Sequence, residues 1–307
     1  MTILTLPSDH RRRRGEAWPP RRVRAQTAAA LSAVLVLGLV PPIVQGQPTR
    51  TPDVIFVPTP IEVVEGMLAV ARVTKDDRLY DLGSGDGRIV IAAAKRFGTH
   101  GIGIDIDPKR IEESRKNADT AGVTRLVEFR QADLFETDLR GATVVTLYLL
   151  PTLNVKLRPK LFAELRPGSR VVSHSFDMGD WQADSALTVG GRMVYYWVMP
   201  SKVEGTWTLK APAGGADRTY ELRLGQKYQR LTGTATSGGR SLSVDSARVV
   251  GDSVTFALAD TTAGAASRGQ GRMRFAGRLN GGTMLGSVTG SGAGGAGQWR
   301  ATRRAGR

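Results

Sequence analysis

Residues 80–88 have the sequence Tyr80-Asp81-Leu82-Gly83-Ser84-Gly85-Asp86-Gly87-Arg88. In this segment, a short apolar strand leads directly into a glycine-rich turn. Glycines directly after a buried strand allow the backbone to approach a bound ligand closely. The third glycine follows the second by two residues, whereas the usual dinucleotide fingerprint spaces them by three. The loop indicates a ligand site that need not hold a pyrophosphate, although the same glycines could also form only a tight turn.

Strands and helices alternate on both sides of this loop. Strands are expected at 78–82, 101–106, 127–130, 142–148 and 168–173, and two more at 186–189 and 192–199 flank the hairpin signal Gly190-Gly191. Helices are expected from Ile61, over 88–97, from Pro108 to Gly122 and around 157–165, the first opening with the capping-box pattern Thr59-Pro60-Ile61-Glu62. This alternation, which ends in a hairpin, predicts a mostly parallel sheet with an antiparallel edge.

Two acidic residues follow the second and third of these strands. Asp105 ends the second strand, 24 residues after Asp81, and Asp133 follows the third. A carboxylate at the first position can accept hydrogen bonds from both ribose hydroxyls of an adenosine, and one at the second can accept from an adenine amino group. Asp105 could instead cap a helix, but Asp107 already fills that role, and Asp133 alone could be an ordinary loop acid. The glycine loop and the two acids, in this order, favour an adenosine-containing ligand.

Over residues 53–200, about half of its length, the chain resembles a class I S-adenosylmethionine-dependent methyltransferase, with residues 80–88 resembling the first cofactor motif. The resemblance implies a Rossmann-like α/β fold and a site for S-adenosylmethionine. The cofactor-binding residues it implies are Thr59, Asp81, Gly83, Ser84, Gly85, Gly87, Asp105 and Asp133.

A narrower resemblance rests on the run Phe56-Val57-Pro58-Thr59-Pro60 and on residues 81–95. These are similar to a branch of protein-lysine methyltransferases whose mitochondrial members modify the adenine nucleotide translocase and the ATP synthase c-subunit. The branch implies a protein substrate that is methylated on a lysine side chain.

Absent residue types narrow the reaction. The chain has no cysteine, which excludes a thiol adduct, a disulfide framework and a thiolate zinc site. It has only three histidines, so a multi-histidine metal site is not expected. The segment 146–151 after the fourth strand lacks the Asp/Asn-Pro-Pro motif of adenine and glutamine-amide methyltransferases.

A lysine acceptor must lose its proton before it can attack, since its ordinary pKa is about 10.4. A desolvated channel lowers that pKa, and aromatic faces hold the cation. The candidate catalytic, substrate-contacting residues are Tyr148, Asp177 and Trp181, on loops after the fourth and fifth strands, and each could equally be a surface or packing residue. His174 could act as a base, although a structural role explains it more simply.

Residues 201–307 form a different, all-β domain. Short alternating strands recur there between glycines, and 21 of the 37 glycines lie in this segment. Eight strands at roughly ten-residue spacing predict an up-and-down barrel or a sandwich. The segment holds 16 basic and 6 acidic residues, so its charge is +10, against −1 for residues 51–200. The basic surface could simply be solvated or could meet an anionic partner such as a membrane surface. Nucleic acid is the least favoured partner, because the aromatic residues alternate as core residues do.

Residues 1–50 read as a signal peptide or membrane anchor. An arginine-rich flank precedes an apolar run over residues 28–40, which is short for a membrane span but suits a signal peptide. Val44 and Gly46 would then precede a cleavage site at Gln47. The interpretation predicts a membrane-associated or exported protein, the alternative being a cytoplasmic one with a misassigned start.

Two classes of function stay open at this stage. One is the methyltransferase of segment 51–200, and the other is a non-catalytic envelope module that binds an anionic partner through its basic β domain. The oligomeric state and the identity of the methyl acceptor are not contained in the sequence.

Overall fold

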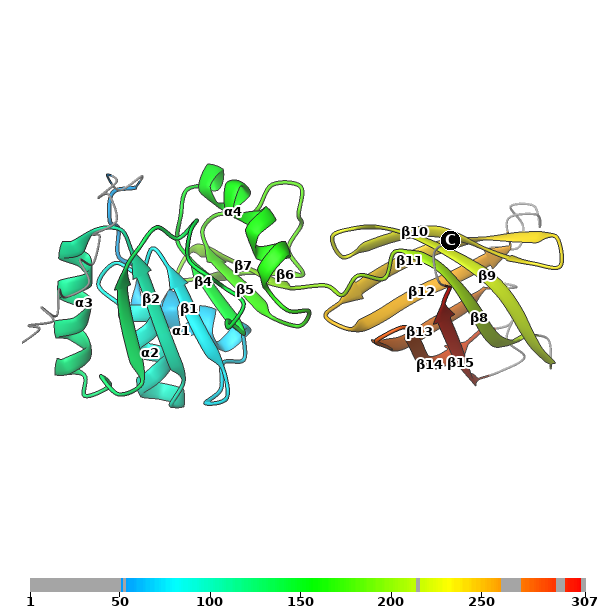
Figure 1. Ribbon diagram of the computed structural model, residues 1–307, viewed down its shortest axis with the longest axis horizontal. Coiled ribbons are helices and arrows are strands. Elements are labelled where there is room, and N and C mark those ends of the chain that lie inside the picture. The colour runs from blue at the N-terminus through cyan, green and yellow to red at the C-terminus, as the bar shows by residue number, and fades with distance from the viewer. Residues whose placement is uncertain (1–50, 52–53, 214–215, 261–271, 291–295, 305–307) are drawn as a thin grey trace, which may run out of the picture. The chain divides into compact units, whose positions relative to one another are not determined.

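The computed structural model describes residue 51 and residues 54–213, 216–260, 272–290 and 296–304 of the 307-residue chain. These residues form one seven-stranded sheet with four helices and one closed barrel of eight strands (Figure 1). The signal or anchor segment predicted for residues 1–50 lies outside the described residues. None of the helices in the described part of the chain is both long and apolar enough to cross a membrane.

The seven-stranded sheet confirms the predicted α/β architecture. Its strands, in spatial order, are β3 (Val127–Gln131), β2 (His100–Asp105), β1 (Arg78–Leu82), β4 (Val144–Leu147), β5 (Arg170–His174), β7 (Arg192–Val198) and β6 (Ser185–Val189). The first five run parallel, and β7 pairs antiparallel with both β5 and β6. The order reverses between β1 and β4, so the carboxyl ends of these strands border the crevice where such sheets bind ligands.

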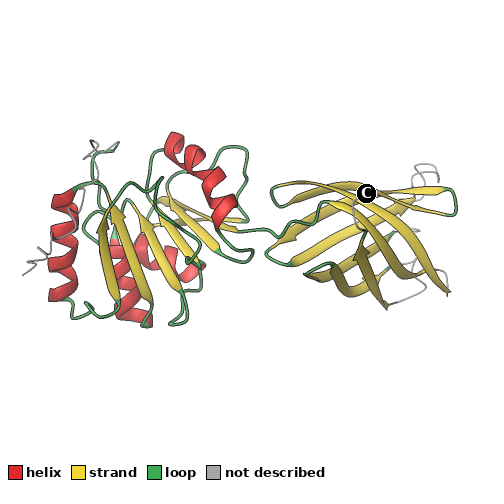
Figure 2. Ribbon diagram, in the orientation of Figure 1, coloured by secondary structure: helices red, strands yellow, loops and turns green. Residues whose placement is uncertain are grey.

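Helices cover both faces of this sheet (Figure 2). The helices are α1 (Ile61–Val70), α2 (Arg88–Phe97), α3 (Pro108–Thr120) and α4 (Pro151–Glu164). The first three bury Val64, Ile89 and Ile111 in one apolar core, whereas α4 buries Leu157 and Leu161 in a second core on the other face. Both faces of the parallel strands are therefore dry, which explains why these strands read as nearly continuous apolar runs.

The helix starts follow the sequence in one case and depart from it in another. Asp107 caps α3 as predicted, since its carboxylate accepts the N–H of Lys109 at 2.8 Å. The capping box predicted for α1 is wrong, because no side chain caps that helix. The Thr59 hydroxyl lies instead 3.1 Å from Nδ1 of His174 in the protein interior. A long-range contact has taken the side chain that local pattern assigned to the helix end.

The all-β segment forms a closed antiparallel barrel rather than a sandwich. Its strands are β8 (Gly205–Ala213), β9 (Ala216–Lys227), β10 (Arg230–Ser237), β11 (Arg240–Val250), β12 (Ser253–Asp260), β13 (Met273–Asn280), β14 (Thr283–Thr289) and β15 (Gly297–Arg303). Neighbours in sequence pair with each other, and β15 pairs with β8 to close the ring.

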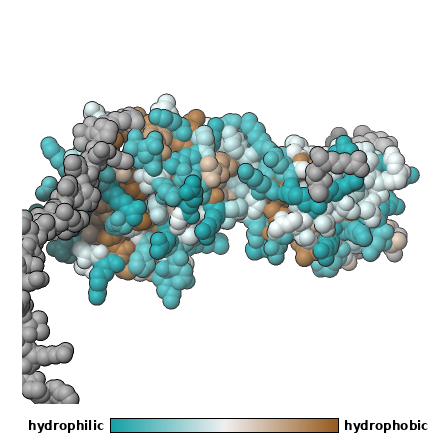
Figure 3. Space-filling model, in the orientation of Figure 1, coloured by the Kyte–Doolittle hydropathy of each residue, from teal (hydrophilic) through white to brown (hydrophobic). Residues whose placement is uncertain are grey.

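Aromatic side chains fill the barrel interior. Phe256 and Phe275 stack at 4.5 Å between ring centroids, and Trp299 meets both rings edge-on. The face of the molecule drawn in Figure 3 is mostly hydrophilic, with smaller hydrophobic areas between. The barrel is therefore a packed core with a polar exterior, as alternating strands require.

Candidate active site

The glycine loop between β1 and α2 is a cradle built from backbone. The carbonyl of Ile104 accepts the N–H groups of Gly83 and Ser84 at 2.8 and 2.9 Å, which fixes the loop against β2. Gly83 and Gly85 adopt φ angles of +81° and +53°, a region that strains other residues. A Cβ on Gly85 would come within 2.2 Å of the Phe56 ring. The loop thus needs glycine both for its conformation and for space.

Asp81 lies at the bottom of this cradle. Its side chain is buried, and its carboxylate accepts a hydrogen bond of 2.8 Å from the Thr146 hydroxyl on β4. Burial raises the pKa of Asp81 to about 7, with further contributions from the neighbouring carboxylates of Asp105 and Asp86. A buried carboxylate that titrates near neutrality can pair with a ligand cation, because that cation would restore its charge.

Asp105 holds the glycine loop and also faces the ligand space. One carboxylate oxygen accepts the N–H of Gly85 at 2.8 Å, and the other accepts the N–H of Asp107 at 2.9 Å. Burial raises its pKa, although both backbone hydrogen bonds act against that shift. Each carboxylate oxygen has a second lone pair, so both can still accept from a ligand hydroxyl.

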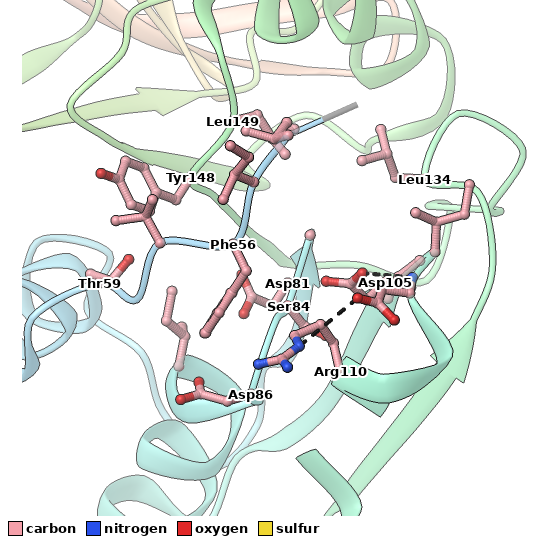
Figure 4. Close-up of a pocket in the computed structure, with 18 of the residues that line it drawn as sticks. Phe56, Thr59, Asp81, Ser84, Asp86, Asp105, Arg110, Leu134, Tyr148 and Leu149 are labelled. Atoms are coloured by element: carbon pink, nitrogen blue, oxygen red, sulfur yellow. Dashed lines mark hydrogen bonds and ion pairs between the residues drawn. The ribbon is translucent and has the colours of Figure 1, made fainter. Parts of the chain in front are cut away.

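A cavity of about 460 Å³ joins the loop and the acids (Figure 4). Its lining includes six of the eight predicted cofactor residues, namely Thr59, Asp81, Gly83, Ser84, Asp105 and Asp133. Gly85 and Gly87 are not part of the lining, but Gly85 anchors Asp105 and Gly87 forms the N-cap of α2. Asp133 accepts the N–H of Phe135 at 2.8 Å.

The segment before α1 forms a second wall of the cavity. The Phe56 ring points into it, and the Arg110 guanidinium on α3 stacks on that ring at 4.9 Å (Figure 4). Arg88 donates to the Thr59 carbonyl at 2.9 Å, while its Nε and Nη2 hold the Asp86 carboxylate at 2.9 and 2.6 Å. These contacts fasten the segment to the start of α2 and to α3.

Sequence reasoning missed the roles of Arg88, Asp86 and Arg110. The first two stand inside the recognised motif, two residues apart, and this proximity was a signal for an ion pair. Arg110 lies on the first turn of α3 with no motif around it, so only the fold reveals its contact with Phe56.

Tyr148 lines the cavity at the end of β4 and packs on a buried histidine. Its ring centroid lies 3.9 Å from that of His174 and 6.3 Å from that of Phe176. His174 is fully buried, and burial together with the charge of Arg192 lowers its pKa to about 4. The imidazole is therefore neutral at pH 7 and acts as a wall behind Tyr148 and Thr59.

Asp177 and Trp181 lie outside the cavity lining, so we do not assign them to substrate contact. Trp181 is fully buried in the core beneath α4, where its ring packs on Phe162 and Trp197 at 4.6 and 5.5 Å. Asp177 is exposed and accepts the N–H of Gly179 within its own turn. Of the three predicted catalytic residues, only Tyr148 reaches the cavity, since the fifth-strand loop folds back onto the helix α4.

The arrangement fits S-adenosylmethionine. The cavity volume lies in the range of ligand sites for small molecules and cofactors. The Ser84 hydroxyl on the cavity wall is buried without a hydrogen-bond partner among the described residues, which leaves it for a ligand. Asp105 and Asp133 follow adjacent strands on one side of the loop, where an adenosine would lie. The described residues hold no cluster of acids and histidines that could bind a metal ion.

Comparisons with known proteins find methyltransferases that are similar to this chain. The ANTKMT methyltransferase domain matches residues 81–185. A protein-lysine N-methyltransferase of Saccharolobus islandicus is 45% identical over 153 residues, which are 48% of this chain and 95% of that protein. The adenine nucleotide translocase lysine N-methyltransferase of Mus musculus is 35% identical over 43% of this chain, which spans 57% of the mouse protein.

A solved structure described as an RNA methyltransferase from Salinibacter ruber, in complex with S-adenosyl-L-homocysteine, is 58% identical. The match covers 48% of this chain and 96% of that chain, at a TM-score of 0.47. The identity to the archaeal enzyme over nearly its whole length, together with the matched domain, confirms the resemblance seen in the sequence. The chain belongs to the family of S-adenosylmethionine-dependent methyltransferases that contains these protein-lysine N-methyltransferases.

Proposed function

We propose that this chain transfers a methyl group from S-adenosylmethionine to the side-chain nitrogen of a protein lysine. The observation that carries the proposal is the 45% identity to an archaeal protein-lysine N-methyltransferase over 95% of that protein. The cofactor supplies an electrophilic methyl group on a sulfonium, and the attacking lysine must be neutral and in line with the carbon–sulfur bond. Positioning and desolvation by the protein therefore supply most of the acceleration.

The residues of the cavity take separate roles in this proposal. Asp105 accepts from the ribose hydroxyls and Asp133 from the adenine amino group, while the loop from Gly83 to Gly87 lies under the amino-acid end of the cofactor. Asp81 faces the cationic end of that ligand from below. Tyr148 lines the approach of the acceptor lysine, where its ring face attracts the ammonium before the proton leaves to water.

The acceptor is tested with the purified full chain, labelled S-adenosylmethionine and a cell-envelope extract. We expect label in a protein band, removed by protease and untouched by ribonuclease, with methyl-lysine identified by mass spectrometry. The variant Asp105→Ala serves as the control that binds cofactor poorly. Label in RNA or in small molecules alone would contradict the lysine acceptor, and no label with a bound cofactor would favour the non-catalytic binding module.

We also propose that residues 1–50 bring the protein to the membrane or into the export pathway. Support comes from the arginine-rich flank and the apolar run over residues 28–40. Fractionation with N-terminal sequencing tests this, because cleavage would leave a chain starting near Gln47 and anchoring would leave Met1 in the membrane fraction. A soluble cytoplasmic protein that starts at Met1 would contradict both. In either location near the membrane, the basic β domain would be close to an anionic lipid surface.

A further inference from the structure

Four neighbouring strands of the barrel contain no acidic residue, and three of them carry basic ones. These strands are β13, β14, β15 and β8, which lie side by side in this order. Their basic residues are Arg274, Arg278, Arg300, Arg303 and Lys210. On the rest of the barrel, β9 carries Asp217 and Glu221, and β11 carries Asp245. The acidic residues of the barrel strands are therefore confined to the other strands, where they stand among further basic residues.

The strand register aligns four of these side chains into one row. Arg278 on β13 lies opposite Leu285 on β14, Leu285 opposite Arg300 on β15, and Arg300 opposite Lys210 on β8. Directly opposite residues have Cβ atoms about 5 Å apart, so the row crosses roughly 14 Å of surface. We call Arg278, Leu285, Arg300 and Lys210 the basic row.

All four side chains of the basic row point outward. Leu285 is 52% exposed, the Arg278 side chain is 74% exposed, and Arg300 and Lys210 are also exposed. The residues next to them along the strands, such as Met284 and Ala301, are buried in the barrel core. Leu285 therefore presents an apolar side chain to the solvent between two arginines and does not pack inside the barrel.

Lys210 and Arg300 are adjacent like charges. Neither makes an ion pair with an acidic side chain of the described residues, whereas Arg278 has one partner, Asp252, at 3.3 Å and at the surface. Like charges directly opposite on neighbouring strands destabilise a sheet. Their presence on strands without acidic residues is explained if an anionic partner supplies the missing negative charge.

The side chains on this face suit a phospholipid surface better than a nucleic acid. Trp207, Phe275 and Trp299 of the same strands are buried inside the barrel, so no aromatic platform is available for stacking bases. Arginine and lysine bind lipid phosphates, and an aliphatic side chain between them can enter the acyl boundary. A leucine flanked by cations is the combination that an interfacial site requires.

We propose that the outer face of β13, β14, β15 and β8, centred on the basic row, docks on an anionic phospholipid bilayer. The inference gives the proposed membrane contact of the β domain a specific surface, and it does not depend on the acceptor of the methyl group. It orients the barrel, because only one side of it can face the lipid.

The test uses the full chain and co-sedimentation with vesicles of phosphatidylcholine alone or with 30% phosphatidylglycerol, on the order of one anionic lipid in three, in low salt. The test variant is Lys210→Gln with Arg300→Gln, and the matched control is Arg223→Gln with Arg240→Gln on β9 and β11. Both remove two exposed cations, so the net charge changes equally. Residues 1–50, which include an arginine-rich stretch, are present in all proteins, so their contribution is common to every comparison.

We expect the test variant to bind anionic vesicles roughly 30-fold more weakly, since each nearby cation contributes about 1 kcal/mol and 1.4 kcal/mol corresponds to tenfold. The control should stay within about threefold of the parent, because Arg223 and Arg240 lie outside the four strands of the proposed face and charges are screened beyond about 10 Å. Leu285→Ser should weaken binding without altering its salt dependence.

Equal losses in both double variants would overturn the proposal, since binding would then follow net charge alone. Equal binding to vesicles with and without phosphatidylglycerol would also overturn it. If a single-stranded RNA bound more tightly than the vesicles and showed the same sensitivity to the test variant, the partner would be nucleic acid instead. Circular dichroism and the affinity for S-adenosylhomocysteine, measured on each variant, separate a folding or cofactor defect from loss of docking.

Discussion

At the scale of the residue, the site contains two carboxylates with reduced solvent exposure: Asp81 is buried and Asp105 is partly buried. Asp81 and Asp105 are each stabilised by hydrogen bonds from the protein, and burial raises the pKa of both. They differ in their partners, because Asp105 accepts two backbone N–H groups and Asp81 accepts one hydroxyl. Asp105 is thus coupled to the shape of the glycine loop, whereas the charge of Asp81 is coupled to pH.

Asp105→Ala should weaken the affinity for S-adenosylhomocysteine by about 2–3 kcal/mol, since hydrogen bonds to a charged acceptor contribute about 1.5–3 kcal/mol. The loss includes some loosening of the loop, because the N–H of Gly85 also loses its acceptor. Isothermal calorimetry measures it, with Asp138→Ala, an exposed loop acid, as the control. Undiminished affinity in the Asp105 variant would refute the ribose assignment.

Asp81→Asn should stabilise the folded protein at pH 8 and should lower its affinity for the cofactor. The folded-state pKa of about 7 lies above the ordinary 3.8, so the wild type gains stability as the pH falls from above 7 towards 4, when the folded state takes up a proton. The amide imitates the protonated form, and the gain at pH 8 should be roughly 2–4 kcal/mol.

Denaturant titrations of the wild type and the Asp81→Asn variant at pH 5 and pH 8 measure this effect. The difference in unfolding free energy between the two proteins should be smaller at pH 5. His174 acts in the opposite direction, since its lowered pKa makes protonation in acid destabilising, but it is present in both proteins and cancels in the comparison. A variant that is less stable than the wild type at pH 8 would contradict the buried-charge argument.

At the scale of the element, the segment before α1 and the glycine loop act as two walls in contact. Phe56 lies over Gly85 so closely that no Cβ fits between them, and Arg110 holds the ring from the side of α3. Thr59 is held by His174 and its carbonyl by Arg88. The entrance to the cofactor cavity is thus formed by segments distant in sequence.

Gly85→Ala should reduce cofactor affinity at least tenfold and cost about 1–2 kcal/mol of stability. The cause is twofold, since alanine is strained at a φ of +53° and its methyl group would displace the Phe56 ring. Adding Phe56→Ala should restore part of the affinity by removing the collision but none of the backbone strain. Thermal melts measure the stability of the single and double variants, and calorimetry measures their affinity for the cofactor. A double variant that binds no more tightly than Gly85→Ala would show that backbone strain alone lowers the affinity.

At the scale of the whole molecule, the chain contains separate apolar cores. The barrel buries one cluster around Trp207, Phe275 and Trp299, and the α/β sheet buries two others, one on each face. All the residues predicted to bind the cofactor belong to the α/β part. The α/β part and the barrel should therefore unfold separately, and only the α/β part should be stabilised by the cofactor.

Differential scanning calorimetry should show two unfolding transitions, of which S-adenosylhomocysteine raises only one. A ligand at 100 times its dissociation constant adds about 2.7 kcal/mol to the transition of the domain that binds it. Phe275→Ala, which removes a buried barrel ring, should lower the other transition at a cost of about 3–5 kcal/mol. A single transition that shifts with both changes would show that the domains unfold together.

Much of the fold follows from sequence alone, because local patterns and burial agree there. The apolar runs of the parallel strands, the glycine loop, the cap at Asp107 and the alternation of the β segment each correspond to an element in the structure. The positions of Asp105 and Asp133 beside the cavity could be predicted as well, because the carboxyl ends of adjacent parallel strands come together at one sheet edge. Tyr148 reached the cavity for the same reason.

Tertiary structure alone decided which loop residues face the cavity and which are buried. Trp181 and Asp177 follow a strand as Tyr148 does, yet the loop that carries them turns back onto α4, where Asn154 donates to its carbonyls. The local sequence predicts that Thr59 caps a helix, but its hydroxyl instead contacts His174, a residue 115 positions away in the chain. Barrel closure and the alignment of Arg278, Leu285, Arg300 and Lys210 also depend on strand register, which long-range pairing sets. Sequence determines what each segment can form, whereas contacts between distant segments determine where its side chains point.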